Sequence, residues 1–101
     1  MTTTKYSNIE MYLCDNYKGF KWRKSRNSET IEYNCNRKTL YDDYVNYCEM
    51  NKYTPVSKNE LHGYLMNNGI VCVAKSHGVL VFKFIKDKFM VHINEIEKKL
   101  I

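Results

Sequence analysis

The spacing of apolar side chains predicts a first helix near the start of the chain, over residues 8–17. Apolar residues recur there every three or four positions, as they do along one face of an α-helix. They are Ile9, Tyr12, Leu13 and Tyr17. Ser7 or Asn8 is expected to cap the first turn, and Gly19 suits the end of the helix.

Apolar and basic residues alternate in the next segment, and alternation is the period of a β-strand. Phe20 and Trp22 are separated by Lys21, and the alternation resumes after a turn-like Arg-Asn-Ser-Glu cluster. Two structures fit: a small hairpin of residues 20–24 with 30–34, or an ordered basic loop. The rings are expected to anchor the core. The other interpretation is that rings and cations together bind bases and phosphates.

Two further helices joined by a short turn are predicted in residues 39–69. Thr39 and Asp42 have the spacing of a capping box, and the acidic residues of this turn are expected to stabilise the helix rather than to perform acid–base chemistry. Pro55 lacks an N–H group and restricts the residue before it, so the first of the two helices must end before Pro55. The apolar face of that helix comprises Leu40, Tyr44, Tyr47 and Cys48, widened by Tyr41 and Val45.

The second helix of this pair is expected to begin at Ser57 and to end at Gly69. Ser57 and Glu60 form a complete capping box, and Gly69 suits a left-handed cap. The buried stripe of this helix is Leu61, Tyr64 and Leu65. Gly63 inside a helix costs about 1 kcal/mol relative to alanine, and one reason to tolerate it is the close approach of another backbone, from the protein or from a nucleic acid.

A tight β-hairpin is predicted next, with strands at residues 70–74 and 79–85. Both segments are rich in Val, Ile and Phe, and Gly78 supplies the positive φ that a tight hairpin turn needs. The end of the chain is expected to form a third strand over residues 89–93 and then a short amphipathic helix over residues 94–101.

Helix, turn, helix and hairpin in this order predict a winged helix, which is an α+β fold. A chain of 101 residues is expected to form a single domain. Its parts are an N-terminal helix and basic segment (1–38), a helix-turn-helix (39–69), the wing and strands (70–93) and a short C-terminal helix (94–101).

Cysteine usage and hydropathy predict an intracellular protein in a reducing compartment. The four cysteines are widely spread and form no C-x-x-C pair, whereas small secreted scaffolds have denser patterns. The N-terminus lacks the apolar stretch of a signal peptide, and the longest apolar run is too short to span a bilayer. We therefore expect free thiols and no membrane partner. A disulfide-bonded scaffold is the less favoured alternative.

Positive charge is concentrated before the predicted helix-turn-helix. The formal net charge is +5 and the isoelectric point is about 9.0. Residues 18–38 contain seven basic and two acidic side chains, so this segment carries a charge equal to that of the whole chain. A basic cluster of this kind is the minimal electrostatic signature of a nucleic-acid-binding protein. The alternative is an ordinary solvated basic surface.

The exposed face of the second helix supplies the candidate base contacts. Asn side chains pair with adenine edges, but Lys58 and Glu60 leave the helix neutral. We therefore expect binding driven by phosphate contacts, in which the basic segment supplies affinity and the helix sets orientation. The candidate DNA-binding residues are Lys21, Arg23, Lys24, Arg26, Lys58, Asn59, His62, Asn67, Lys75 and His77.

No motif indicates catalysis, a cofactor or a metal. His62, His77 and His92 are far apart and give no zinc-binding spacing with the cysteines. The chain contains no phosphate-binding loop, no dinucleotide-binding glycine motif and no nucleophile elbow. We expect neither enzymatic activity nor a small-molecule substrate.

Residues 40–70 resemble the C-terminal winged-helix segment of viral and phage or plasmid primase–helicases, the poxvirus type included. The residues that carry the resemblance are Leu40, Tyr41, Tyr44, Tyr47 and Cys48, followed by Ser57, Leu61, Gly63, Leu65 and Gly69. The resemblance covers about a third of the chain and implies a role in DNA replication. The helicase core and its nucleotide-binding loop are absent, so the resemblance implies neither ATP hydrolysis nor primer synthesis.

Two functions remain open at this point. The first is a winged-helix DNA-binding module that acts in viral or mobile-element replication. The second is a protein-interaction module on the same scaffold, which tethers a replication or transcription partner or antagonises a host factor. The neutral second helix and the exposed position expected for Met66 favour the second function.

Overall fold

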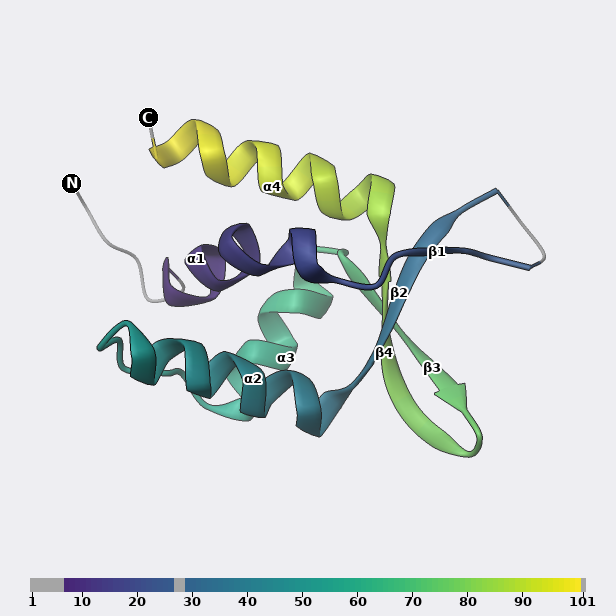
Figure 1. The fold of residues 1–101 in the computed structure, drawn as a ribbon, viewed down its shortest axis with the longest axis horizontal. Helices are drawn as coiled ribbons and strands as arrows, with labels where there is room; N and C mark the ends of the chain where they lie inside the picture. The colour runs from purple at the N-terminus through teal and green to yellow at the C-terminus, as the bar shows by residue number, and fades with distance from the viewer. Residues whose placement is uncertain (1–6, 27–28, 101) are drawn as a thin grey trace.

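Four α-helices and a four-stranded antiparallel sheet surround one core in the computed structural model, which describes residues 7–26 and 29–100 (Figure 1). The helices are α1 (Ser7–Asn16), α2 (Arg37–Met50), α3 (Lys58–Asn67) and α4 (Lys86–Leu100), and a short 3-10 helix, η1 (Tyr17–Gly19), follows α1. The strands are β1 (Arg23–Lys24), β2 (Ile31–Asn36), β3 (Val71–Ser76) and β4 (Val79–Ile85). The domain is therefore α+β, as the hydrophobic pattern predicts.

Strand β4 is central in the sheet, whose order is β1-β2-β4-β3. It pairs antiparallel with β2 on one side and with β3 on the other. Directly opposite residues share a face of the sheet, and Phe82 lies opposite Cys35 while Phe84 lies opposite Tyr33. In Figure 1 the β1–β2 and β3–β4 hairpins extend from the helices in different directions.

The core lies between this face of the sheet and the helices. Phe82 and Phe84 on β4 are fully buried. Every helix contributes buried side chains to the same cluster: Ile9, Leu13, Leu40, Tyr44, Leu61, Leu65, Phe89 and Ile93. Because the four helices bury their apolar faces against one another and the same strands, their positions are fixed by a shared hydrophobic contact.

The aromatic residues before β1 attach the first hairpin to the core. The Phe20 ring stacks on Tyr33 with centroids 4.6 Å apart, and the Trp22 indole N–H donates to the Tyr17 carbonyl at 3.1 Å. Strand β1 pairs with β2, as the hairpin prediction requires, although β1 has only two residues. Both rings are partly buried against the core, which supports the core-anchor interpretation.

The predicted start of α2 at Thr39 is wrong. The helix begins at Arg37, and Asn36 is its N-cap. The Asn36 side chain accepts hydrogen bonds from the backbone N–H groups of Lys38 and Thr39 at 2.9 and 3.3 Å. Asp42 instead forms an ion pair with Lys38 at 3.0 Å. Strand β2 runs directly into the helix, so no loop in the sequence marks the boundary.

The third strand predicted over residues 89–93 and the short helix predicted over residues 94–101 are also wrong. The single helix α4 replaces both, and residue 101 lies outside the described part. Phe89, Ile93 and Ile96 are buried at helical spacing. This spacing outweighs the strand preference of the Phe-Met-Val-His-Ile sequence, because β-propensity depends strongly on context.

Several other local predictions are confirmed, with two differences in extent. Helix α1 already begins at Ser7, so neither Ser7 nor Asn8 is its N-cap, and β3 extends to Ser76, two residues beyond the predicted strand. Helices α1 and α3 occupy the predicted segments to within about one residue, and α2 ends before the proline. The Ser57 hydroxyl accepts from the Glu60 N–H at 3.2 Å, and Gly69 has a φ of 68°. The turn between β3 and β4 consists of His77 and Gly78, whose φ values of 52° and 81° are typical of a type I′ hairpin turn.

The four cysteines are unpaired. Cys35 and Cys48 are buried, Cys14 is partly buried and Cys72 is exposed. Free thiols are consistent with the expected reducing compartment. In the part of the chain that the structure describes, no helix is both long and apolar enough to cross a membrane.

We expect Asn36→Ala to lower the free energy of unfolding by about 1 kcal/mol, because two backbone N–H groups of α2 lose their acceptor. Thr39→Ala should change it by less than about 0.5 kcal/mol, since Thr39 is exposed and does not cap the helix. Urea denaturation of both variants measures the difference. Equal losses, or a larger loss at Thr39, would contradict the assignment of the cap.

Candidate functional site

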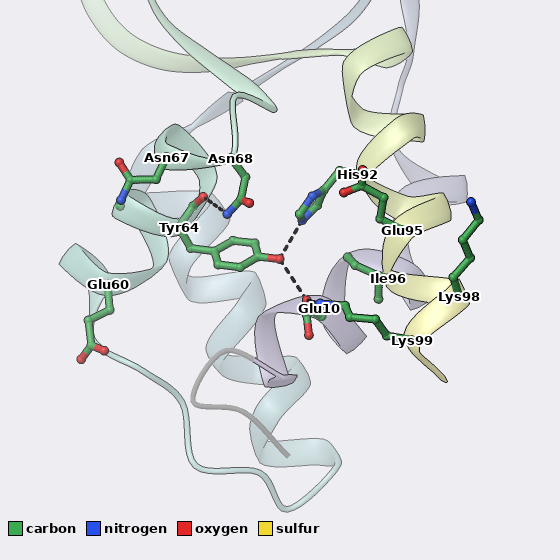
Figure 2. Close-up of a pocket in the computed structure, with 11 residues that line it drawn as sticks. Glu10, Glu60, Tyr64, Asn67, Asn68, His92, Glu95, Ile96, Lys98 and Lys99 are labelled. Carbon is green, nitrogen blue, oxygen red and sulfur yellow. Dashed lines mark hydrogen bonds and ion pairs between the residues drawn. The ribbon is translucent and has the colours of Figure 1, made fainter. Parts of the chain in front are cut away.

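Two concave surfaces border the exposed face of α3. The first, which we call the basic cleft, has a volume of about 420 Å³. It is lined by Asn36, Arg37, Lys38, Lys58, Asn59, His62, Val79 and Leu80. The second, which we call the α3–α4 groove, has a volume of about 660 Å³ (Figure 2). It is lined by Glu10, Glu60, Gly63, Tyr64, Asn67, Asn68, His92, Glu95, Ile96, Lys98 and Lys99.

The basic cleft combines three cationic side chains with two helix N-termini. Arg37 and Lys38 lie in the first turn of α2, and Lys58 is the first residue of α3. A helix N-terminus adds partial positive charge. The N-caps Asn36 and Ser57 already accept hydrogen bonds from three of the N–H groups of these two termini, and Lys38 is also ion-paired with Asp42. Among the described residues that line the cleft, none is acidic. This arrangement favours an anion, and phosphate is an anion that binds at helix N-termini.

Phe82 positions two polar residues of the basic cleft. Its ring meets the His62 ring edge-on with centroids 4.8 Å apart, and the Arg37 guanidinium lies 6.0 Å from its centroid. Burial lowers the pKa of His62, and the charges of Arg37 and Lys58 lower it further. The imidazole is therefore neutral near pH 7, and it adds no further cation to the cleft.

The β3–β4 hairpin extends the cleft with two more of the predicted contact residues. Lys75 is exposed on β3 and lies opposite Leu80, which lines the cleft. His77 is exposed in the hairpin turn. The structure therefore brings Lys58, Asn59 and His62 together on one surface, and it places the hairpin beside them.

The remaining predicted contact residues lie elsewhere. Lys21, Arg23, Lys24 and Arg26 are in or beside β1, at the opposite edge of the sheet from β3. Lys24 is ion-paired with Glu29 at 3.3 Å. Asn67 lines the α3–α4 groove. The basic segment of residues 18–38 therefore does not form one surface, because its cations are divided among η1, the β1 hairpin and the cleft.

The sequence-based prediction did not include Asn36, Arg37 or Lys38 in the site. It counted the two cations within the basic segment but placed the start of the helix at Thr39. The signal that could have located them is Asn36 itself, because asparagine is a strong N-cap residue. Their position beside the start of α3, however, is a consequence of tertiary packing.

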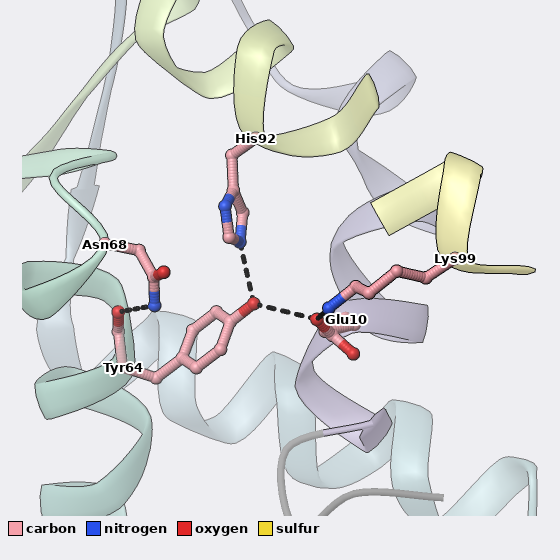
Figure 3. A network of polar contacts seen from close by, with 5 residues as sticks. All are labelled: Glu10, Tyr64, Asn68, His92 and Lys99. Carbon is pink, nitrogen blue, oxygen red and sulfur yellow. Dashed lines mark hydrogen bonds and ion pairs between the residues drawn. The ribbon is translucent and has the colours of Figure 1, made fainter. Parts of the chain in front are cut away.

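A chain of hydrogen bonds joins three helices at the floor of the α3–α4 groove (Figure 3). The Tyr64 hydroxyl lies 2.7 Å from His92 Nε2 and 3.4 Å from Glu10 Oε2. Lys99 Nζ donates to the same Glu10 oxygen at 2.8 Å. In Figures 2 and 3 the Tyr64 side chain crosses from α3 toward α4, and its hydroxyl lies between His92 and Glu10.

Burial determines the protonation states in this network. It raises the pKa of the Tyr64 phenol, and Glu10 raises it further. Burial also lowers the pKa of His92, against the opposing effects of Glu10 and Glu95. Near pH 7 the groove therefore contains a neutral phenol and a neutral imidazole, which bind by hydrogen bonding. Within residues 7–26 and 29–100, no three His, Cys, Asp or Glu side chains are grouped so as to hold a metal ion.

Comparisons of the chain with protein-family models, curated proteins and solved structures found no match. The resemblance of residues 40–70 to primase–helicases therefore stays a prediction. The function has to be argued from the charges and contacts of the two surfaces that flank α3.

We expect the free energy of unfolding to fall as the pH drops below about 6.5. Burial lowers the pKa values of His62 and His92 in the folded state, so the unfolded chain binds more protons in this range. His92→Gln keeps a hydrogen-bonding partner for Tyr64 and should make the dependence shallower. Urea denaturation at a series of pH values measures the slope.

The matched control for this measurement is His77→Asn. His77 is exposed in the hairpin turn, and asparagine tolerates its positive φ. We expect this variant to keep the slope of the unmodified protein. If His92→Gln also keeps that slope, the buried imidazole of the groove does not contribute to the pH dependence, and the interpretation fails.

Proposed function

We propose that this chain is a winged-helix domain that binds DNA mainly through phosphate contacts, with α3 facing the duplex. The observation that carries the proposal is the basic cleft. Its three cations and two helix N-termini lie on one surface, beside the β3–β4 hairpin. In helix-turn-helix proteins the second helix lies in the major groove while neighbouring elements contact the backbone.

The order of the elements supports the winged-helix part of the proposal. Along the chain, α1, β2, α2, α3, β3 and β4 form the succession helix, strand, helix, helix and hairpin. Strand β2 lies beside β4, so the strand that precedes the two helices is joined to the hairpin that follows them. In this interpretation β3–β4 is the wing, and β1 and α4 are additions to the fold.

The charge distribution supports positioning by phosphates more than strong base recognition. Lys58 is the only Lys or Arg of α3, whereas Arg37 and Lys38 come from α2. Phosphate contacts fix the orientation of a protein on DNA without reading sequence. Asn59 carries the amide type that pairs with adenine, which gives the helix a modest means of discrimination. The cations of the β1 hairpin form a second, separate group.

The resemblance to primase–helicases extends the proposal to a biological role. The matching residues lie in α2 and α3 and in the caps of α3. In a role in viral or mobile-element replication, the domain would bind forked or single-stranded DNA as well as duplex, whatever the sequence. Phosphate-driven binding meets that requirement because it is independent of sequence.

We expect labelled duplex DNA to bind with an affinity that falls steeply as salt rises, because counterions are released. The double variant Lys38→Gln/Lys58→Gln should lower the slope of log affinity against log salt by about 2. Titrations of duplex, forked and single-stranded DNA at two or more salt concentrations measure both effects. The Lys21→Gln/Lys24→Gln variant measures the contribution of the β1 hairpin to the salt dependence of DNA binding in the same way.

Lys88→Gln/Lys98→Gln is the matched control, because it removes the same charge from exposed positions on α4. The proposal predicts that this control keeps the slope of the unmodified protein. Absence of binding at low salt, or binding indifferent to salt, would exclude it. Equal effects of the cleft variant and the α4 control would show that net charge alone is responsible.

A further inference from the structure

Gly63 occupies the middle of α3 although nothing inside the domain requires a glycine there. It lies in the α-helix and is not one of the positive-φ glycines, Gly69 and Gly78. A Cβ atom added at Gly63 would meet nothing within 4 Å in the described part of the chain. Glycine weakens a helix relative to alanine. The position is therefore suboptimal for stability and is not explained by the fold.

The space beside Gly63 is the α3–α4 groove. Gly63 is one of the residues that line this groove, which has a volume of about 660 Å³. The floor is held by Tyr64, whose hydroxyl contacts His92 and Glu10 (Figure 3). The groove is therefore pre-formed by contacts among α1, α3 and α4. A glycine in its wall allows another backbone to come close to α3.

The charges around the groove indicate what kind of molecule approaches. Glu10, Glu60 and Glu95 line it, although the chain as a whole has a net charge of +5. Lys99 binds the Glu10 carboxylate, and Lys98 extends away from Tyr64 in Figure 2. Glu60 contacts its N-cap Ser57, so Glu95 is the exposed carboxylate of the groove. A carboxylate disfavours the phosphates of a nucleic acid and favours a cationic side chain. The groove thus differs in charge from the basic cleft on the other side of α3.

Apolar surface lies next to these carboxylates. Ile96 and the Tyr64 ring line the floor of the groove, where they are 1% and 9% exposed. Met66, which follows Gly63 by three residues and so lies on the neighbouring part of the helix face, is 50% exposed. Methionine is adaptable and recurs at surfaces that bind helices. Helix α3 has ten residues, which is about 15 Å or nearly three turns.

We propose that the α3–α4 groove binds a short amphipathic helix of a partner protein. Small or apolar residues of this helix pack against Gly63 and Tyr64, and a Lys or Arg at the border of its apolar stripe reaches Glu95. Such helix-in-groove recognition uses anchors spaced three or four residues apart. This site is distinct from the proposed DNA contact, and neither depends on the other.

The first experiment selects ligands for the full chain from a phage-displayed library of randomised helical peptides of about 16 residues, long enough to span α3. We expect enrichment of peptides with an apolar stripe bordered by Lys or Arg. Enrichment of acidic peptides, or no enrichment above an unrelated bait, overturns the proposal.

The second experiment measures a selected peptide against variants of the groove by fluorescence anisotropy. Gly63→Ala should raise the melting temperature by about 4–8 °C and lower the affinity for the peptide at least fivefold. Gly63→Leu should abolish peptide binding. Gly63→Ala should therefore raise stability while it lowers peptide affinity. This combination is not expected if Gly63 serves only the fold. A lower melting temperature for Gly63→Ala, or unchanged peptide affinity, overturns the proposal.

The third experiment tests charge and separates the two proposed surfaces. Glu95→Lys should lower the affinity for the peptide at least tenfold. Glu49→Lys makes an equal charge change at an exposed position of α2, and its peptide affinity should stay within twofold of that of the unmodified protein. Titration of the Gly63 variants with duplex DNA should show unchanged affinity. If the Gly63 variants no longer bind DNA and Glu95→Lys leaves the peptide affinity unchanged, the groove binds DNA and the peptide proposal is wrong.

Discussion

The burial of Phe82 and Phe84 on the central strand β4 is the constraint on which the rest of the structure depends. Phe84 contacts the rings of Phe20, Tyr33 and Phe89, so it joins the first hairpin and α4 to the sheet. Phe82 contacts His62 and lies beneath Arg37. Two side chains of one strand therefore organise both the core and the basic cleft, and fully buried aromatic rings dominate the energetics of such cores.

Local signals explain why much of the fold could be predicted from the sequence. Ser57, Gly69 and Gly78 each specify a cap or turn by themselves, and the structure confirms all three. The start of α2 was missed because Thr39 and Asp42 imitate a capping box, while Asn36 both ends a strand and caps the helix. Helix α4 was missed because a short apolar run fits a strand or a buried helix equally well. The two surfaces beside α3 could not be predicted, because they depend on contacts between distant segments.

Helix α3 presents two surfaces of different character to its surroundings. On one side, cations from α2 and α3 and the base of the β3–β4 hairpin favour phosphate. On the other, carboxylates and a hydrogen-bonded tyrosine surround the gap at Gly63. If both proposals hold, a single ten-residue helix would join a nucleic acid to a protein partner. The two functions that the sequence left open would then be complementary.

Two strands of the sheet pass into helices without an intervening residue. Strand β2 ends at Asn36 and α2 begins at Arg37, while β4 ends at Ile85 and α4 begins at Lys86. The rotation of each helix about its own axis is thereby fixed relative to the sheet. One inserted residue would rotate the helix by about 100° and turn its buried face toward solvent. An insertion or deletion of one residue at either junction would therefore disrupt the core. The direction in which the buried faces of α2 and α4 point is therefore determined by the orientation of the last residues of β2 and β4.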